Sequence, residues 1–254
     1  MDRLKGKVAI VTGSARGLGR AQAVLFAKEG AKVVVADRLE KGGEETVEMI
    51  RKAGGEAVFR KTDVSKSVQV KSLVEATVSS YGKVDVMVND AGVVDPKEGS
   101  TVDCEERIFD ETIAINLKGI WLGMKYVIPE MIKGGGGSII NIASIAAIRA
   151  FFGNPAYAAS KGGVVSVSRV AATEFGSKGI RVNCIAPGSV MTPMLVDLWE
   201  GTNLREYYTK LTPTGRLSEE EDIAALSLFL ASDESSNING ETISVDGGLT
   251  ARQP

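Results

Sequence analysis

The stretch Val8-Ala9-Ile10-Val11-Thr12-Gly13-Ser14-Ala15-Arg16-Gly17-Leu18-Gly19 joins a short apolar run to a glycine-rich turn that opens a helix-length segment. A run that is apolar throughout is typical of a parallel strand buried on both faces. Glycines between a strand and a helix let backbone N–H groups and the helix N-terminus approach a pyrophosphate closely. The gaps of four and two positions between Gly13, Gly17 and Gly19 differ from the G-x-G-x-x-G fingerprint, so a plain tight turn remains an alternative.

The same alternation of strand and helix continues along the chain. Short β-branched runs are followed by longer amphipathic segments, which indicates a parallel sheet with helices on both faces. The expected strands are residues 8–12, 32–36, 56–61, 84–89, 138–142, 181–185 and 242–245, and the expected helices include residues 17–29, 68–81, 104–132, 156–177 and 219–231. We therefore predict an α/β protein with a Rossmann-like, doubly wound fold and a seven-stranded parallel sheet.

The 254 residues are expected to form a single dinucleotide-binding and catalytic domain (1–254), because that length suits one large α/β unit and no internal repeat is present. Gly134-Gly135-Gly136-Gly137 is expected to end a helix before a strand. Ser218-Glu219-Glu220-Glu221 predicts a capping box at the start of a late helix. Residues 189–213 break the alternation and are rich in Met and aromatic side chains. We expect a substrate lid there, with a packed surface helix pair as the alternative.

Composition indicates which binding partners and which cellular compartment are expected. The formal net charge is −2 and there is no long basic or acidic run, so nucleic-acid and membrane-surface binding are poorly supported. The N-terminal apolar run is too short for a signal peptide, and no stretch approaches the roughly 18 apolar residues of a membrane span. We expect a soluble cytoplasmic protein.

The chain contains no histidine and two cysteines. The absence of histidine excludes the Ser-His-Asp triad and His-ligated zinc. Cys104 and Cys184 lie far apart without metal-ligand spacing, so we expect two structural thiols in a reducing compartment and no metal site. Acid–base chemistry must therefore come from Tyr, Lys, Cys or carboxylates.

Tyr157 and Lys161 are the strongest candidates for that chemistry. Their spacing of four places the phenol and the ammonium on one face of a helix, one turn apart. A fixed cation favours the phenolate, so we expect a lowered Tyr157 pKa and a proton donor and acceptor usable near neutral pH. Ser144, upstream, is placed to hold a carbonyl oxygen while the proton moves. Taken alone, the pair is also compatible with an exposed Lys beside a half-buried Tyr.

A carboxylate completes the pattern expected of a dinucleotide site. Asp37 follows the second predicted strand, 18 positions after Gly19. A ribose-binding acid stands about 20 positions beyond the glycine turn in this type of fold. A simple turn residue is the alternative interpretation of Asp37.

Several motifs occur in a fixed order: the glycine turn of residues 12–19, Asn89-Asp90-Ala91-Gly92, Asn116, Ser144, Tyr157-x-x-x-Lys161 and Pro187-Gly188. In this combination the chain resembles the short-chain dehydrogenase/reductase family over essentially its whole length. One departure is Asp90, which replaces the second Asn of the family's Asn-Asn-Ala-Gly and affects the expected local hydrogen bonding.

The resemblance implies where an NAD(H) cofactor binds. Asp37 would hold the adenosine ribose, Asp63 and Val64 would border the adenine, and Thr192 would lie near the nicotinamide carboxamide. The full set of residues implied to bind it is Gly13, Arg16, Gly17, Leu18, Gly19, Asp37, Asp63, Val64, Asn89, Ala91, Gly92, Tyr157, Lys161, Pro187, Gly188, Val190 and Thr192.

The resemblance also implies the catalytic residues Asn116, Ser144, Tyr157 and Lys161. Tyr157 would exchange a proton with the substrate while hydride passes to or from the nicotinamide, and Ser144 would bond the substrate oxygen. Lys161 would lower the Tyr157 pKa and contact the nicotinamide ribose, and Asn116 would hold a water that links Lys161 to solvent.

The predicted function is an NAD(H)-dependent oxidoreductase that interconverts a secondary alcohol and its ketone. An NADPH-dependent 3-oxoacyl-carrier-protein reductase is the near alternative, which Asp37 disfavours and Arg16 and Arg38 favour. A non-catalytic nucleotide sensor would be expected to lose Ser144 or Tyr157, and a methyltransferase would not need the Tyr–Lys pair.

The substrate is expected to be a small and apolar alcohol or ketone, because Met191, Leu195 and Trp199 lie in the predicted lid. Arg149 is either solvated or placed to meet an anionic group. The resemblance implies a homotetramer, with the helices of residues 104–132 and 156–177 at one interface and the C-terminal strand at another.

Overall fold

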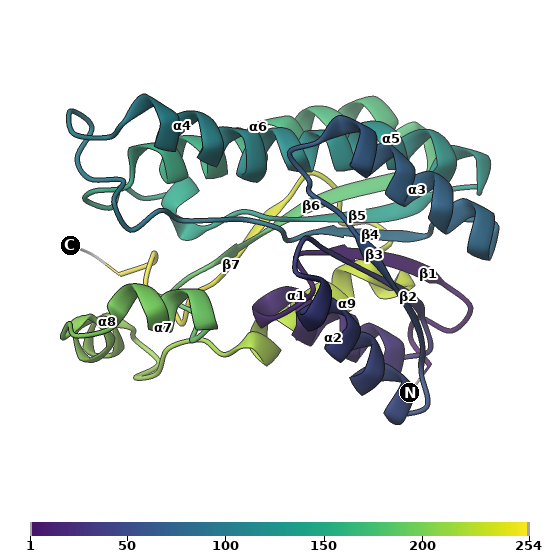
Figure 1. Ribbon diagram of the computed structural model, residues 1–254, viewed down its shortest axis with the longest axis horizontal. Coiled ribbons are helices and arrows are strands. Elements are labelled where there is room, and N and C mark those ends of the chain that lie inside the picture. The colour runs from purple at the N-terminus through teal and green to yellow at the C-terminus, as the bar shows by residue number, and fades with distance from the viewer. Residues whose placement is uncertain (1, 253–254) are drawn as a thin grey trace.

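The computed structural model describes residues 2–252. Within them, seven strands form one sheet in the order β3-β2-β1-β4-β5-β6-β7, and all neighbouring strands are parallel (Figure 1). The strands are β1 (Val8–Thr12), β2 (Lys32–Asp37), β3 (Glu56–Lys61), β4 (Val86–Asn89), β5 (Gly137–Ile142), β6 (Ile180–Pro187) and β7 (Thr242–Val245). The predicted Rossmann-like sheet is confirmed, and each strand end lies within two residues of its expected position.

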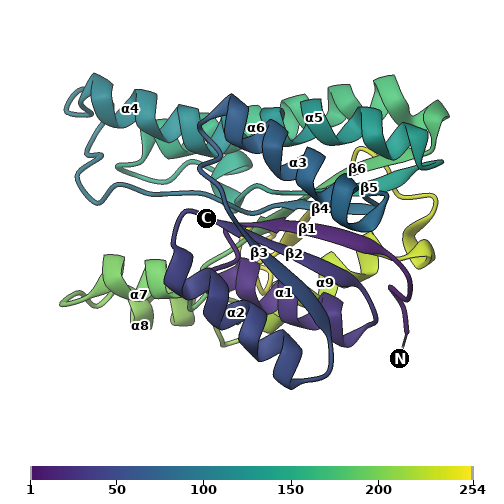
Figure 2. The same ribbon diagram turned by 45° about the vertical axis from the view of Figure 1, so that its right-hand side comes forward.

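Helices cover both faces of this sheet (Figure 1 and Figure 2). One layer consists of α1 (Gly17–Lys28), α2 (Glu40–Lys52) and α9 (Glu220–Ala231), and the other of α3 (Ser67–Tyr81), α4 (Glu106–Ile113), α5 (Gly119–Lys133) and α6 (Pro155–Phe175). Two short helices, α7 (Pro193–Trp199) and α8 (Leu204–Leu211), lie beyond the C-terminal end of β6 and carry no buried residue. The predicted break in the alternation at residues 189–213 therefore corresponds to this helix pair.

The strand order places a crevice beside β1. Its neighbours are β2 on one side and β4 on the other, so the direction in which the chain winds reverses there. Ligands of doubly wound sheets bind outside the carboxyl ends of the strands at such a switch point. β1 ends at Thr12 and β4 at Asn89, so Gly13 and Asp90 begin the loops that border the crevice.

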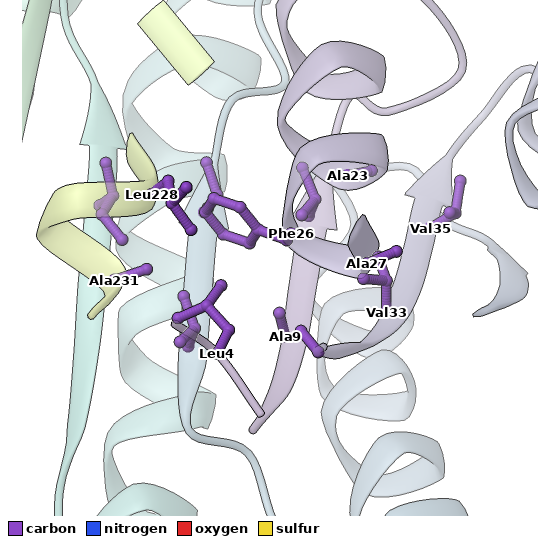
Figure 3. Packing of buried hydrophobic residues seen from close by; sticks show 14 of the residues in the cluster. Leu4, Ala9, Ala23, Phe26, Ala27, Val33, Val35, Leu228 and Ala231 are labelled. Carbon is purple, nitrogen blue, oxygen red and sulfur yellow. The ribbon is translucent and has the colours of Figure 1, made fainter. Parts of the chain in front are cut away.

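A buried apolar cluster holds α1 against the sheet. Phe26 extends from α1 toward Leu228 of α9, and Leu4 lies close to both (Figure 3). Phe26 and Leu4 have no exposed surface, and full burial of a large apolar side chain contributes about 1.5–3 kcal/mol. This packing positions the N-terminus of α1, where the glycine turn lies.

The expected helix of residues 104–132 is not one regular helix. It begins at Glu106, and a π-helical turn (Ala114–Lys118) separates α4 from α5. Single π-helical turns are rare and often occur at functional sites. Here the wider turn brings Asn116 against Val93, whose N–H and C=O both bond the Asn116 amide.

The capping box of α9 lies one residue later than predicted. Glu219 is the N-cap and Asp222 the N3 residue, and each side chain bonds the backbone of the other. The Ser218 hydroxyl does not cap the helix but donates to the Val245 carbonyl oxygen at 3.3 Å. The glycine run of residues 134–137 ends a helix before a strand, as predicted, because α5 ends at Lys133 and β5 begins at Gly137.

Candidate active site

A cleft of about 1020 Å³ opens at the carboxyl ends of the strands. It runs from the glycine turn, past the end of β5, to α7 and α8. Of the predicted site residues, those that line it are Gly13, Arg16, Gly17, Leu18, Asp37, Asp63, Val64, Ala91, Gly92, Ser144, Tyr157, Lys161, Pro187, Gly188, Val190 and Thr192. The structure thus brings together side chains from most of the length of the chain.

Three predicted residues lie behind the cleft wall instead. Asn89 is buried in the sheet, where its amide donates to Asn141 Oδ1 at 2.8 Å. Gly19 packs so closely on the Gly13 carbonyl that a Cβ there would clash with it. Asn116 is fully buried and bonded to Val93. These residues shape the site without lining it.

Tyr157 and Lys161 lie on the first turns of α6, one turn apart as predicted. Pro155 stands at the first helical position, where a missing N–H costs nothing. Lys161 is buried, and its Nζ donates to the Ile142 carbonyl oxygen at 2.7 Å. Burial lowers the Lys161 pKa to about 8, against the opposing charge of Asp90. Its Nζ lies 5.6 Å from the centroid of the Tyr157 ring.

Ser144 follows β5 and faces Tyr157. Its Oγ accepts the Ala146 N–H at 3.1 Å, which orients the hydroxyl at the start of a short 3₁₀ turn. The Ser144 hydroxyl also lies close enough to the Tyr157 phenol to oppose the rise of its pKa. The two hydroxyls can therefore act on the same substrate oxygen.

The expectation that Lys161 lowers the Tyr157 pKa below its ordinary value is wrong. Burial raises the pKa of Tyr157, and this effect exceeds the opposing hydrogen bond from Ser144. The charges of Asp90 and Glu98 raise this pKa further. The physical reason is that a phenolate loses hydration in this enclosed position, and the partner cation is itself buried.

The glycine turn has the backbone geometry of a close approach. Gly13 and Gly17 have φ angles of 70° and 62°, in the left-handed region that favours glycine. A Cβ on Gly13 would lie 2.8 Å from the Ala91 backbone, whereas a Cβ on Gly17 would meet nothing closer than 3.9 Å. The turn is therefore packed on the sheet side and open toward the cleft, as a pyrophosphate site at a helix N-terminus requires.

Asp37 is oriented by the backbone around it. Its Oδ2 accepts the Ala15 N–H and its Oδ1 the Leu39 N–H, each at 2.9 Å. Each carboxylate oxygen keeps a free lone pair that can accept a hydroxyl. Asp63, in the next loop, bonds the backbone N–H and hydroxyl of Ser65. These residues fit an adenosine, and the turn fits a dinucleotide pyrophosphate.

Asp90 is an acidic group at the floor of the cleft. Its Oδ1 accepts a hydrogen bond from Gln22 at 3.3 Å. Burial raises the Asp90 pKa to about 7, although the charge of Lys161 opposes this shift. The residue that departs from the family motif thus adds a group that titrates near neutral pH.

Two further expectations concern Arg149 and the cysteines. Arg149 donates to the Arg252 carbonyl oxygen at 3.0 Å and does not line the cleft. Cys104 and Cys184 are both free thiols. Within residues 2–252, no cluster of acidic, His or Cys side chains has metal-binding geometry, and no helix is long and apolar enough to cross a membrane.

Glu98 is a site residue that the sequence reasoning missed. It is 1% exposed and its Oε1 accepts the backbone N–H of Tyr157 at 2.9 Å. A single Glu in a loop, 59 positions from its partner, carries no local signal of this contact.

The fold and this cleft together define an α/β protein with a candidate dinucleotide site, and comparison with known proteins names the family. A family model described as enoyl-(acyl carrier protein) reductase matches residues 13–250. The chain is 40% identical to the 2,5-dichloro-2,5-cyclohexadiene-1,4-diol dehydrogenase of Sphingobium indicum, with 97% of each chain covered. It is also 40% identical to the 3-oxoacyl-[acyl-carrier-protein] reductase of Thermotoga maritima, over 97% of this chain and 99% of the relative.

Among solved structures, levodione reductase superposes with a TM-score of 0.93 at 35% identity, covering 98% of this chain and 100% of that one. The protein belongs to the short-chain dehydrogenase/reductase family. Members of this family act on CH–OH groups with a nicotinamide cofactor, so an oxidoreductase activity of this kind follows.

Proposed function

We propose that the protein is an NAD(H)-dependent dehydrogenase that interconverts an apolar secondary alcohol and its ketone. The observation that carries the proposal is the meeting of Ser144, Tyr157 and Lys161 in a cleft whose other end holds a glycine turn and the Asp37 carboxylate. A bound nicotinamide supplies the hydride acceptor for oxidation and the hydride donor for reduction.

Ser144 and Tyr157 handle the substrate oxygen. Tyr157 Oη takes the alcohol proton during oxidation and returns it to the ketone during reduction. Because Ser144 Oγ accepts the Ala146 N–H, its own O–H is free to donate. That donor stabilises the substrate oxygen, where the charge changes most during the reaction.

Lys161 and Asn116 support the proton transfer. One N–H of the Lys161 ammonium is committed to Ile142, which leaves two donors for the cofactor ribose and for a proton path. Gly92 lies between Lys161 and Asn116, because a Cβ on it would be 3.6 Å from Lys161 Nζ and 3.4 Å from Asn116 Oδ1. We propose that a water held by Asn116 bridges this gap.

The preference for NAD(H) is assigned to Asp37. Its carboxylate oxygens face the cleft with free lone pairs for the two ribose hydroxyls. A 2′-phosphate would place nearly two negative charges beside it. Arg16 and Arg38 also line this end of the cleft and would partly offset that repulsion.

The substrate end of the cleft favours an apolar and uncharged molecule. Its wall includes Phe151, Met194, Leu198 and Trp199. Of the described residues that line the cleft, the cationic ones are Arg16 and Arg38 at the adenosine end and the buried Lys161. An anionic substrate would therefore find no cation along this apolar wall. A six-membered alicyclic alcohol suits this wall, in line with the name of the cyclohexadiene-diol dehydrogenase relative.

The second candidate is an NADPH-dependent 3-oxoacyl-carrier-protein reductase. It is favoured by the similarity to the Thermotoga maritima reductase and by the two arginines at the cofactor end. Asp37 and the lack of a cation at the substrate end disfavour it.

We further propose that residues 189–213 act as a lid and that the protein is a cytoplasmic homotetramer. Phe109, Trp121 and Val170 of α4, α5 and α6 are apolar and at least 40% exposed, which suits helices that meet a second copy. Light scattering in solution tests the assembly, with a mass of four chains expected and a monomer contradicting it.

A panel of secondary alcohols tests the function. Each alcohol is assayed with NAD⁺ and with NADP⁺, beside a 3-oxoacyl thioester with NADPH. We expect NAD⁺ reduction with alicyclic alcohols and little with hydroxy acids. Faster turnover of the thioester with NADPH would replace the proposal by the second candidate.

A further inference from the structure

Glu98 connects the loop that follows β4 to the catalytic helix. Its side chain is almost completely buried, and Oε1 accepts the Tyr157 N–H at 2.9 Å. The other carboxylate oxygen, Oε2, is buried and has no hydrogen-bond partner among residues 2–252. Burying a carboxylate oxygen without a partner costs free energy, and such groups in native structures often have a catalytic or other functional explanation.

The start of α6 depends on this contact. Asn154 is the N-cap residue, yet its side chain caps no helical N–H and instead donates to the Phe152 carbonyl oxygen at 3.4 Å. Pro155 has no N–H. The Glu98 carboxylate therefore supplies the cap from outside the helix, at the end where negative charge is favoured.

The same contact ties Tyr157 to the cleft wall. The segment between Val93 and Glu98 lines the cleft through Val93, Val94, Asp95 and Pro96. Asn116 holds one end of this segment through both polar backbone groups of Val93. Glu98 holds the other end through Tyr157. A shift of this wall would therefore be transmitted to the turn of α6 that carries the phenol.

The charge of Glu98 also acts on the phenol. Burial is the main cause of the raised Tyr157 pKa, Ser144 opposes it, and the charges of Asp90 and Glu98 add to it. The other ionisable groups around this region are Lys161 on α6, and Asp95, Cys104 and Glu105 on the loop that carries Glu98. Lys161 provides the only positive charge in this set.

We infer that Glu98 is a positioning residue for proton transfer: its carboxylate fixes the backbone of Tyr157 against the cleft wall, and its charge sets the pH range in which the phenol works. The inference rests on the proposed function of Tyr157 as the acid–base group. Two conservative variants separate the hydrogen bond from the charge.

Glu98→Gln keeps an oxygen that can accept the Tyr157 N–H and removes the charge. We expect kcat at high pH to change less than twofold, while the pH midpoint for alcohol oxidation moves to lower pH, because a phenolate forms more easily without a neighbouring anion. Glu98→Asp keeps the charge and withdraws the oxygen by one methylene. We expect an unchanged pH midpoint and a kcat lower by about tenfold or more, since small misplacements of reacting groups cost up to about 100-fold.

Glu105→Gln is the matched control. Glu105 is on the same loop, exposed, and its side chain does not cap α4. It makes only an exposed ion pair with Arg107. We expect both the pH midpoint and kcat of this variant to match those of the wild type.

NMR titration of the tyrosine phenols gives a readout that needs no substrate, with Tyr157→Phe identifying the Tyr157 signal. We expect this signal to titrate at lower pH in Glu98→Gln than in the wild type. An unchanged Tyr157 titration in Glu98→Gln would overturn the inference, even if the wild type proves inactive toward every alcohol tested. If the wild type is active, a pH midpoint of Glu98→Gln equal to that of the wild type, Glu98→Asp and Glu105→Gln would also overturn it.

Discussion

Asp90 and Lys161 line the same cleft floor, and each shifts the protonation of the other. The charge of Lys161 lowers the Asp90 pKa, but burial outweighs it and raises that pKa to about 7. The charge of Asp90 in turn raises the Lys161 pKa, but burial outweighs it and lowers that pKa to about 8. The site therefore holds an acid and a base that both titrate close to neutral pH.

Replacing Asp90 by Asn, the residue usual in the family motif, should stabilise the fold at neutral and higher pH. The folded pKa of Asp90 lies above its ordinary value of 3.8, so the folded state binds more protons than the unfolded state between those two values. The wild type therefore loses stability as pH rises from about 4 to about 7. Above that range we expect Asp90→Asn to unfold with a free energy about 1–3 kcal/mol higher.

Urea unfolding across the pH range measures this difference, and it should vanish below pH of about 4, where the wild-type carboxyl is neutral. Asp95→Asn is the comparison variant, because it removes another carboxylate that lines the cleft and leaves Asp90 in place. A constant difference between Asp90→Asn and the wild type at every pH would mean that hydrogen bonding, rather than charge, decides the effect.

Asp37 is expected to decide the choice between NAD(H) and NADP(H). A like-charge pair at about 4 Å costs on the order of 4 kcal/mol at an effective dielectric near 20. Solvent and salt reduce this to about 1–3 kcal/mol, or about 10- to 100-fold in kcat/KM. Asp37→Ser should remove most of this preference, and Asp37→Asn should do so while keeping an acceptor for the Leu39 N–H.

The measurement is kcat/KM for both cofactors in the wild type and each variant. Adding Arg38→Gln to Asp37→Ser should reverse any gain with NADP(H), because Arg38 is a cation that lines the cleft beside Asp37. A wild type that uses NADP(H) equally well would contradict the assignment.

Residues 189–213 should become ordered over the substrate. Helices α7 and α8 bury no residue, and Trp199 of α7 stacks on Tyr208 of α8, with ring centroids 5.2 Å apart. Segments with few buried contacts exchange their amide hydrogens quickly. We expect slower exchange in this segment when NAD⁺ and alcohol are both present, and no change in β4. Equal exchange in the two states would reject the lid.

The sheet and most of the cleft could be predicted from the sequence for clear physical reasons. Strands buried on both faces are apolar throughout, and the helical spacing of Tyr157 and Lys161 places them together. Contacts between distant segments could not be predicted. The π-helical turn at Asn116 occurs where the Asn116 amide bonds the backbone of the distant Val93, and the cap of α6 comes from Glu98. The net direction of the Tyr157 pKa depends on burial, which no local pattern reveals.

The central claim is that Tyr157 exchanges the proton at the substrate oxygen. Tyr157→Phe preserves the ring packing and removes only the hydroxyl, so a single turnover with saturating NAD⁺ and alcohol measures the chemical step directly. We predict a rate lower by about 10²- to 10⁴-fold, with NAD⁺ affinity within about tenfold of the wild type because a phenol–ribose contact is worth only about 0.5–1.5 kcal/mol. A variant that keeps more than about a tenth of the wild-type rate would contradict the claim, because removing a general acid–base group costs far more.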